Sequence, residues 1–241
     1  MKDIKTENLW LMQGDRLERM KEIESGSVDA IVCDPPFNIV EKIGKNIHLF
    51  RQGEKQVNSS ITPESMSFDT GFDQTTWLEL AAEKLKKCGN FIIFNDWENM
   101  GEIAKEARRL KLKVKMVGHW QKPNPNPAEW RRRFVSGREY FIHLTKGGKN
   151  TFNVEKLHFG EFKIPLTPQS EKTFGKHPNQ KPVRLMLEIV EILSNEGDSI
   201  LDPFMGSGST GVACVKSGRR FVGIELNEEY YCLSKNRIEN A

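Results

Sequence analysis

The sequence predicts an α/β protein built on a doubly wound, mostly parallel sheet with helices on both faces. Short apolar runs alternate along the chain with segments whose apolar residues recur at helical spacing. Acidic residues end three of the predicted strands, at Asp34, Asp202 and Glu225, and Asp15 lies just past the end of a fourth. Because ligands of such sheets bind beyond the carboxyl ends of the strands, we expect the functional site at that edge.

The predicted strands are short apolar runs bounded by glycine, proline or polar residues. They cover 9–13, 28–33, 90–94, 114–120, 140–144, 199–202 and 220–225. The run at 28–33 indicates a parallel strand buried within the sheet, because apolar residues occupy most of its positions.

Helices are expected between these strands, at 16–24, 77–85, 98–110, 182–196, 209–217 and from 228 onward. Asp73 and Asn227 belong to residue types that cap helix N-termini. Pro182 suits the first turn of a helix, and Gly197 suits the position after a helix end.

Three longer segments, 38–72, 121–137 and 145–181, show no regular periodicity. Segments of that length without secondary structure are usually functional. A chain of 241 residues suits one α/β domain. We therefore expect a single domain over 1–241, with the loops 38–72 and 121–137 inserted near the active site.

Composition excludes several classes of protein. Hydrophobic content of 37% and charged content of 29% are ordinary for a soluble globular chain, no apolar run approaches a membrane span, and the N-terminus lacks the apolar core of a signal peptide. We therefore expect a cytoplasmic protein. The four cysteines form no CxxC pair, which argues against a zinc site or a redox dithiol. The net charge of +3 permits nucleic-acid binding without requiring it.

The most informative motif is Asp34-Pro35-Pro36-Phe37, which ends the apolar run at 28–33. Its two prolines lack N–H donors and stiffen the backbone. The chain therefore leaves the sheet in a rigid turn that gathers a carboxylate, free proline carbonyls and an aromatic ring. Such a site can accept hydrogen bonds from a planar amino group and stack on the ring that bears it. The exocyclic amine of adenine or cytosine fits this description, whereas a simple strand-ending turn is the alternative.

A second motif is a G-x-G-x-x-G pattern at Gly206, Gly208 and Gly211, between a predicted strand and a predicted helix. Glycines there permit a tight turn and the close approach of a ligand to the backbone. Glu225 ends the next strand, 19 residues after Gly206, where an acid can accept both hydroxyls of a ribose. The pattern alone would fit NAD or FAD. However, the 16 residues after Glu225 are too few to complete a dinucleotide-binding fold from this point.

A third motif is the segment 177–182, His-Pro-Asn-Gln-Lys-Pro, just ahead of a predicted helix. Lys181 within it can pair with a carboxylate as a mobile point charge. Taken alone, the segment is also compatible with a solvated loop before a helix-starting proline.

Together, the three motifs resemble the signature set of the S-adenosylmethionine-dependent DNA amino methyltransferases, and the resemblance covers nearly the whole chain. The catalytic motif at Asp34 precedes the cofactor motif at Gly206, which is similar to the permuted beta group of that family. The resemblance implies a seven-stranded Rossmann-like methyltransferase sheet with circularly permuted motif order. Two departures are Phe37, where Tyr is commoner, and Asn179, where Thr or Ser is usual; neither removes the stacking ring.

The resemblance implies that S-adenosylmethionine is the methyl donor and that no metal is needed. It implies Glu225 at the ribose hydroxyls, Asp15 facing the adenine and Lys181 at the methionine carboxylate. The remaining implied cofactor residues lie in and beside the glycine-rich turn: Asp202, Phe204, Gly206, Ser207, Gly208, Ser209 and Thr210.

For catalysis, the resemblance implies a target base flipped out of the duplex. Phe37 would stack on that base, while Asp34 and the carbonyl of Pro35, next to Pro36 in the motif, would accept hydrogen bonds from its amino group. These acceptors favour a pyramidal nitrogen, and Asp34 binds the increasingly cationic transition state better than the ground state. Aspartate in the first motif position resembles the adenine-N6 enzymes, so N6-adenine methylation is predicted and N4-cytosine methylation is the alternative.

DNA contacts are expected from basic residues in the irregular segments, unless these runs are only solvated faces. The candidates are Lys42, Lys45, Arg51, Lys122, Arg131, Arg132 and Arg133, together with the aromatic Trp130. The segment 145–176 lies where the resemblance places target recognition. Its shortness predicts a short recognition site or help from a partner subunit, so a homodimer and a cognate restriction endonuclease are candidate partners besides DNA.

Three other functions remain as alternatives. A dinucleotide-dependent oxidoreductase would leave the motif at 34–37 unexplained. A methyltransferase acting on RNA or on a protein side-chain amide would use almost the same chemistry. A DNA-binding module that has lost catalysis is disfavoured, because every expected catalytic position is filled.

Overall fold

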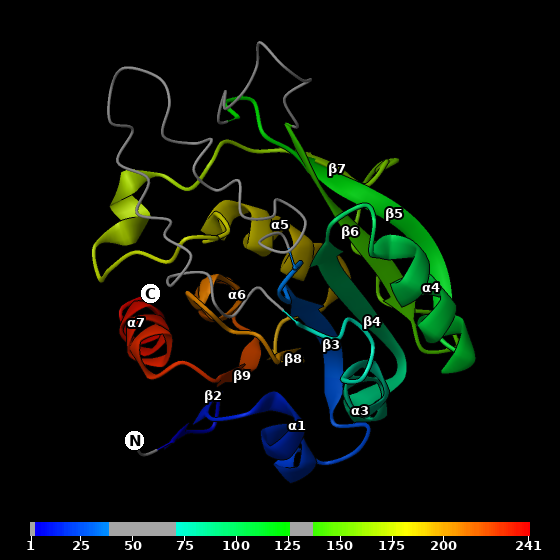
Figure 1. Cartoon of the computed structure of the whole chain (residues 1–241), viewed down its shortest axis with the longest axis horizontal. Helices are drawn as coiled ribbons and strands as arrows, with labels where there is room; N and C mark the ends of the chain where they lie inside the picture. Colours follow the sequence, from blue (N-terminus) through cyan, green and yellow to red (C-terminus); the bar gives the residue numbers. More distant parts are fainter. Residues whose placement is uncertain (1–2, 39–70, 126–136) are drawn as a thin grey trace.

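The computed structural model describes residues 3–38, 71–125 and 137–241 (Figure 1). Within these residues the chain forms one mixed sheet of nine strands in the order β1-β2-β9-β8-β3-β4-β6-β5-β7. Seven strands correspond to predicted ones: β2 (Leu9–Gln13), β3 (Val28–Cys33), β4 (Leu85–Asn95), β5 (Lys113–Gln121), β6 (Arg138–Thr145), β8 (Ser199–Asp202) and β9 (Arg220–Glu225). The predicted α/β class is therefore confirmed.

Two short strands at the edges of the sheet were not expected. β1 (Ile4–Lys5) pairs antiparallel with β2, and β7 (Glu161–Lys163) pairs parallel with β5. The expectation of seven strands is therefore corrected to nine within the described part of the chain. Segments of two and three residues are too short to show an alternating pattern, so the sequence carried no sign of them.

Strand direction changes within the sheet, and this change shapes the site. The strands β2, β9, β8, β3 and β4 run parallel, whereas β6 runs antiparallel to β4. In the register of that pair, Asn95 at the end of β4 lies opposite Tyr140 near the start of β6. The first residues of β6 therefore lie at the same edge as the carboxyl ends of the parallel strands.

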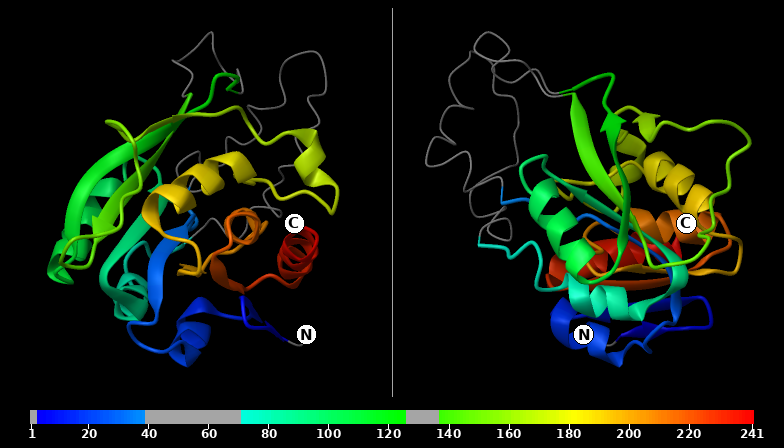
Figure 2. Two further views of the ribbon diagram at one scale, coloured as in Figure 1. Left: turned by 180° about the vertical axis from the view of Figure 1, so that it is seen from behind. Right: turned by 90° about the vertical axis from the view of Figure 1, so that its right-hand side faces the viewer.

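Helices cover both faces of the sheet (Figures 1 and 2). One face carries α5 (Val183–Leu193), α6 (Ser209–Lys216) and α7 (Glu228–Glu239). The other carries α3 (Leu78–Lys84), α4 (Met100–Arg109) and the short turns α1 (Arg16–Arg19) and η1 (Met20–Glu22). In the described ranges, no helix combines the length and apolar composition needed to cross a membrane.

The core consists of one apolar layer on each side of the sheet. Successive residues of β3 alternate between the layers: Ala30 and Val32 pack on the side of α5–α7, and Ile31 and Cys33 pack on the side of α3 and α4. Burial of both faces explains the almost continuous apolar run in the sequence. Because β3 is the middle strand of the nine, Asp34, which follows it, lies near the middle of the carboxyl edge of the sheet.

One of the two predicted helix caps differs from the structure and the other is confirmed. Asp73 does not cap α3: its carboxylate accepts from the N–H groups of Thr75 and Thr76 in a turn ahead of the helix, whose first residue is Leu78. Asn227 does cap α7, since its Oδ1 accepts from the N–H of Tyr230 at 3.0 Å. An additional short turn, η4 (Gln169–Lys172), lies within the segment 145–181.

Candidate active site

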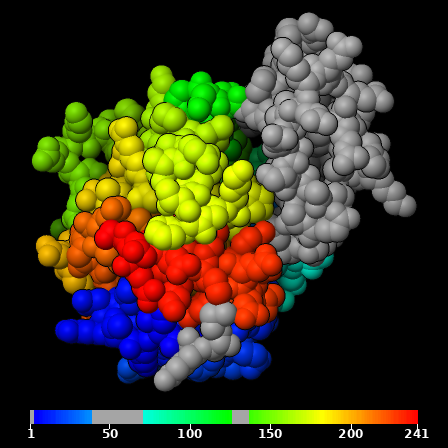
Figure 3. Space-filling view, turned by 90° about the vertical axis from the view of Figure 1, so that its left-hand side faces the viewer, coloured from blue at the N-terminus to red at the C-terminus, as the bar shows by residue number. Residues whose placement is uncertain are grey.

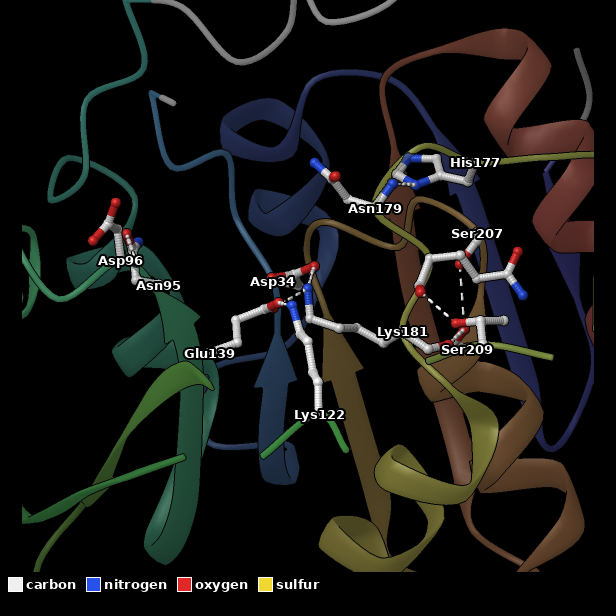
Figure 4. Close-up of polar contacts among 12 residues, drawn as sticks. Asp34, Asn95, Asp96, Lys122, Glu139, His177, Asn179, Lys181, Ser207 and Ser209 are labelled. Atoms are coloured by element: carbon white, nitrogen blue, oxygen red, sulfur yellow. Dashed lines mark hydrogen bonds and ion pairs between the residues drawn. The ribbon is translucent and has the colours of Figure 1, made fainter. Parts of the chain in front are cut away.

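A cavity of about 960 Å³ opens at the carboxyl edge of the parallel strands. The three motif segments meet there, because their residues follow β3, follow β8 and precede α5 (Figure 4). The predicted catalytic and cofactor residues that line the cavity are Asp34, Pro35, Pro36, Phe37, Lys181, Asp202, Phe204, Gly206, Ser207, Ser209, Thr210 and Glu225.

Four charged side chains form a continuous chain at the centre of this cavity (Figure 4). The ammonium of Lys181 contacts the Oδ2 atom of Asp34 and lies 2.6 Å from Oε1 of Glu139. Lys122 closes the chain, with its Nζ atom 2.7 Å from Oε2 of Glu139. The two carboxylates and two ammonium groups balance in charge, which offsets the cost of burying them.

The electrostatic environment shifts the titration of these groups. Burial raises the pKa of Asp34 to about 6, although the ammonium of Lys181 opposes that rise. Burial acts to raise the pKa of Glu139 as well, but Lys181 and Lys122 outweigh it and lower this pKa to about 2. The pKa of Lys181 is raised by the two carboxylates despite its burial. Lys181 therefore stays charged at neutral pH, and the pKa of Asp34 lies closer to neutrality than that of Glu139.

One oxygen of Asp34 is left for a ligand. Its Oδ1 atom is buried and accepts no hydrogen bond within the described part of the chain, whereas Oδ2 is held by Lys181. A buried carboxylate oxygen without a donor is costly, and such groups mark functional sites. The ring of Phe37 lines the same cavity, 5.6 Å from the Nζ atom of Lys181. A hydrogen-bond acceptor and an aromatic ring thus belong to the lining of one cavity.

The glycine-rich turn forms the other half of the cavity. Gly206 adopts a left-handed φ of +51°, and its N–H donates to Oε2 of Glu225 at 2.7 Å. The N–H of Asn227 donates to Oε1 of the same carboxylate at 2.8 Å. Each oxygen of Glu225 therefore keeps capacity to accept a further hydrogen bond. Burial raises the pKa of Glu225.

The other glycines of the turn serve packing. Gly208 has a φ of +76°, and a Cβ atom there would lie 2.8 Å from the Cβ of Ser234 in α7. A Cβ atom on Gly211 would lie 2.5 Å from Cδ1 of Ile238. These two glycines allow α6 and α7 to approach, and neither lines the cavity. Gly208 was predicted to bind the cofactor; it does not line the cavity, and that role stays a prediction.

The strand end at Asp202 is strongly buried. Oδ1 of Asp202 accepts from the N–H of Phe204 at 3.0 Å, which fixes the start of the turn. Burial raises the pKa of Asp202 to about 7. Ser209 joins the turn to the third motif, because its hydroxyl donates to the carbonyl oxygen of Lys181 at 2.7 Å.

Several predicted residues lie elsewhere than expected. The carboxylate of Asp15 caps α1 by accepting from the N–H of Leu17 at 2.8 Å, and Asp15 does not line the cavity. Lys122, predicted to contact DNA phosphates, lines the cavity and pairs with Glu139. The placement of Lys181 at a cofactor carboxylate stays a prediction, and its contacts to two protein carboxylates do not support it. The remaining DNA-contact candidates lie outside the described residues: Lys42, Lys45, Arg51, Trp130, Arg131, Arg132 and Arg133.

Sequence reasoning missed Glu139, Arg16 and Arg237. Glu139 lies near the start of an antiparallel strand, so a search for acids at the carboxyl ends of strands overlooks it. Its position directly before the apolar run at 140–144 was the signal that could have indicated it. Arg16 lines the cavity with its guanidinium 4.7 Å from the ring of Phe72. Arg237 of α7 is buried and donates to the carbonyl of Ser207. Arg16 lies in α1 and Arg237 lies in α7, and nothing in the sequence around either residue indicated these contacts.

Helix α7 also holds the segment that leads into the third motif. Glu171 in η4 lies 3.7 Å from the guanidinium of Arg237 and accepts from the N–H of Val183 at 3.0 Å. In the space-filling view, the residues around η4 (yellow) lie directly against α7 (red) (Figure 3). The segment that carries Lys181 is therefore anchored at both ends.

Comparisons with known proteins agree with this geometry. The sequence model of the DNA methylase family matches residues 28–236. The type II methyltransferase M2.DpnII of Streptococcus pneumoniae is 31% identical, over 95% of this chain and 89% of its own length. The type II methyltransferase M2.LlaDCHI of Lactococcus lactis subsp. cremoris is 30% identical, over 98% of this chain and 91% of its own length.

Solved structures give the same result. M1.HpyAVI in complex with SAM superposes with a TM-score of 0.74 at 29% identity, covering 95% of this chain and 98% of that chain. The cytosine-N4-specific PvuII DNA methyltransferase, with a TM-score of 0.73 over 97% of this chain and 87% of its own, is 17% identical and shows the shared fold alone. The resemblance drawn from the three motifs is confirmed. The chain belongs to the DNA methylase family of N6 and N4 amino methyltransferases.

Proposed function

We propose that this DNA methylase transfers a methyl group from S-adenosylmethionine to the N6 amino group of a flipped-out adenine in DNA. The observation that carries this proposal is the buried Oδ1 atom of Asp34, an acceptor without a donor in the described residues, beside the ring of Phe37. An aminated planar ring would bring the N–H donor that Asp34 Oδ1 lacks in the described residues, and its face could stack on the ring of Phe37. A base can reach the site only after leaving the helical stack.

The second half of the cavity fits S-adenosylmethionine. The carboxylate of Glu225 accepts from the backbone N–H groups of Gly206 and Asn227, and its oxygens have further lone pairs that could accept from ribose hydroxyls. The turn from Gly206 to Thr210 would hold the methionine portion, and Phe204 offers an aromatic wall. When bound, S-adenosylmethionine supplies an electrophilic methyl group. The cavity volume of about 960 Å³ also suffices for a base beside it.

The catalytic role of Asp34 follows from its charge and its anchoring. The lone pair of an exocyclic amine is delocalised into the ring, and acceptors on its hydrogens favour a pyramidal nitrogen with a localised lone pair. Asp34 Oδ1 and the Pro35 carbonyl would be those acceptors. Because Lys181 holds Oδ2, the other oxygen is fixed in place without reorganisation. The negative charge stabilises the amine as it becomes cationic, and a carboxylate with a pKa of about 6 can take the proton that the product loses.

The remaining parts of the proposal extend the family resemblance. Adenine is preferred to cytosine because aspartate occupies the first position of the motif at 34–37. The segment 145–176 would contribute to target recognition, and the order of the motifs would be the permuted one. A homodimer and a cognate restriction endonuclease are proposed partners, and a cytoplasmic location is proposed with them.

Transfer of a labelled methyl group tests this function. Purified protein would be incubated with methyl-labelled S-adenosylmethionine in three parallel reactions, which contain duplex DNA, single-stranded DNA or RNA. The proposal is supported if the wild type transfers label to DNA and a variant lacking the Asp34 carboxylate does not. Efficient labelling of RNA or of the protein fraction without labelling of DNA would contradict it. Binding of S-adenosylmethionine but not of NAD, measured in the same preparation, excludes the oxidoreductase alternative.

A further inference from the structure

Three amide side chains, two of them buried and one half-buried, form a chain of hydrogen bonds beside the catalytic segment. Asn95, the last residue of β4, is fully buried, and Gln74, ahead of α3, is 5% exposed. The Nδ2 atom of Asn95 donates to Oε1 of Gln74 at 2.8 Å. Asn99 adds the third amide, with its Nδ2 atom 2.7 Å from Oδ1 of Asn95. We call Gln74, Asn95 and Asn99 the amide relay.

The amide relay ends on two backbone carbonyls of the catalytic motif. Nε2 of Gln74 donates to the carbonyl oxygen of Pro36 at 2.9 Å, and Nδ2 of Asn99 donates to that of Phe37 at 3.2 Å. A carbonyl oxygen can only accept, so these two contacts fix the orientation of both terminal amides. The orientation of Asn95 between them then follows, since its nitrogen must face the remaining oxygen of Gln74.

The position of these contacts matters because they bracket Phe37. The carbonyl of Pro36 belongs to the peptide plane before the Cα atom of Phe37, and the carbonyl of Phe37 belongs to the plane after it. Holding both planes restrains the backbone dihedrals of Phe37 and therefore the direction of the Cα–Cβ bond from which its ring extends. The N–H groups that hold other turns are missing here, since Pro35 and Pro36 have none. Side-chain donors replace them.

We propose that Gln74, Asn95 and Asn99 are positioning residues that aim the ring of Phe37 at the target base, an inference that rests on the proposed function. A displacement of about 1 Å in a reacting group can cost about 100-fold in rate. The amide relay would therefore act on the chemical step and on base stacking. Binding of S-adenosylmethionine at the other half of the cavity would not depend on it.

The first test substitutes Gln74→Met, which preserves length and volume but removes the donor to Pro36. Single-turnover methyl transfer should fall about 10- to 100-fold, while the Kd for S-adenosylmethionine stays within about twofold. With 2-aminopurine at the target position, the change in fluorescence that reports stacking of the flipped base should differ from that of the wild type. An unchanged single-turnover rate in Gln74→Met would overturn the proposal.

A matched pair on one strand separates positioning from stability. Asn90 is also a buried amide of β4, but its Nδ2 atom donates to the carbonyls of Thr151 and Leu193, far along the strand from the motif. Asn90→Ala and Asn95→Ala should both lower the Tm, because each leaves buried groups unpaired. Only Asn95→Ala should slow methyl transfer by the folded enzyme. Equal slowing by both variants would overturn the proposal.

A double-mutant cycle tests whether the amide relay acts through Phe37. If it does, Gln74→Met should slow the Phe37→Ala enzyme by less than about threefold, since the ring it positions is already absent. If the rate losses of Gln74→Met and Phe37→Ala instead multiply in the double variant, the amide relay does not act through Phe37. The wild-type rate is measured first, and absence of methyl transfer to DNA by the wild type would refute the proposed function itself. If the wild type is active and the amide-relay variants transfer the methyl group as fast as it does, only the role of the amide relay is refuted.

Discussion

Lys181 contacts the Oδ2 atom of Asp34, and the other oxygen, Oδ1, is buried without a donor in the described part of the chain. The pairing makes the two oxygens inequivalent: Oδ2 is a structural anchor, and Oδ1 is the available acceptor. Glu139 holds Lys181 from the opposite side, 2.6 Å from its Nζ atom. A carboxylate held in this way needs no rearrangement to receive an amino group.

Asp34→Asn should lower the rate of methyl transfer by about 100- to 1,000-fold, the effect of removing one preorganised charged group from a transition state. Asp29→Asn is the matched control, because Asp29 lies on β3, the strand that Asp34 follows, but pairs with Lys86 and the N–H of Ser199. The measurement is single-turnover transfer at saturating S-adenosylmethionine. Equal rates for wild type and Asp34→Asn would remove Asp34 from the mechanism.

Activity should depend on pH through Asp34. The acceptor is the ionised carboxylate, whose pKa is raised to about 6 by burial, so the rate should rise as the pH passes upward through about 6 and then level off. As the pH falls below about 6, the protonated form accumulates and the rate should fall about tenfold per pH unit. A single-turnover profile from pH 5 to 8 checks this. A rate that stays constant down to pH 5 would contradict the assignment.

Lys181→Met should shift that profile to higher pH, because the ammonium opposes the rise in the pKa of Asp34. It should also cost about 3–5 kcal/mol of unfolding free energy, since two buried carboxylates lose their shared partner. Lys122→Met leaves the contact between Lys181 and Asp34 in place, and its profile should shift less. Denaturant unfolding and the pH–rate profile of both variants measure these effects.

The same pair of variants distinguishes two roles for Lys181. If its ammonium serves Asp34, Lys181→Met should alter the pH dependence while the Kd for S-adenosylmethionine stays near that of the wild type. A large rise in that Kd with an unshifted pH profile would favour the cofactor carboxylate as its partner.

Gly208→Ala should destabilise the fold by about 2 kcal/mol or more, because the new Cβ atom would combine a strained φ of +76° with a contact of 2.8 Å to Ser234. Gly197→Ala is the control: its φ of +81° carries the same strain, but nothing lies within 4 Å of its Cβ position. Thermal unfolding of both variants separates packing from backbone strain. A smaller loss of stability in Gly208→Ala than in Gly197→Ala would contradict the packing role.

The central fold and half of the site could be predicted from the sequence because their signals are local. Apolar runs marked seven strands, and the strand ends at Asp34, Asp202 and Glu225 marked the edge at which the cavity lies. The resemblance of the three motifs identified the family. These features depend on short stretches of chain and on the rule that parallel strands end together.

The missed features depend on contacts between distant residues. Glu139 reaches the cavity because β6 reverses direction, and strand direction cannot be read from an apolar run. The partner of Lys181 is 147 positions away in the chain, and the amide relay joins residues 74, 95 and 99 to the motif at 34–37. Asp15 follows a strand and caps the next helix, so its place at the cofactor adenine stays a prediction.

The most direct test identifies the methylated base. Wild-type protein and Asp34→Asn would each be incubated with S-adenosylmethionine and unmethylated genomic DNA, which is then digested to nucleosides for mass spectrometry. The account predicts N6-methyladenine in DNA treated with the wild type and a product reduced about 100-fold or more with Asp34→Asn. N4-methylcytosine would keep the mechanism but contradict the choice of base. No methylated nucleoside from the wild type, despite binding of S-adenosylmethionine, would contradict the central claim.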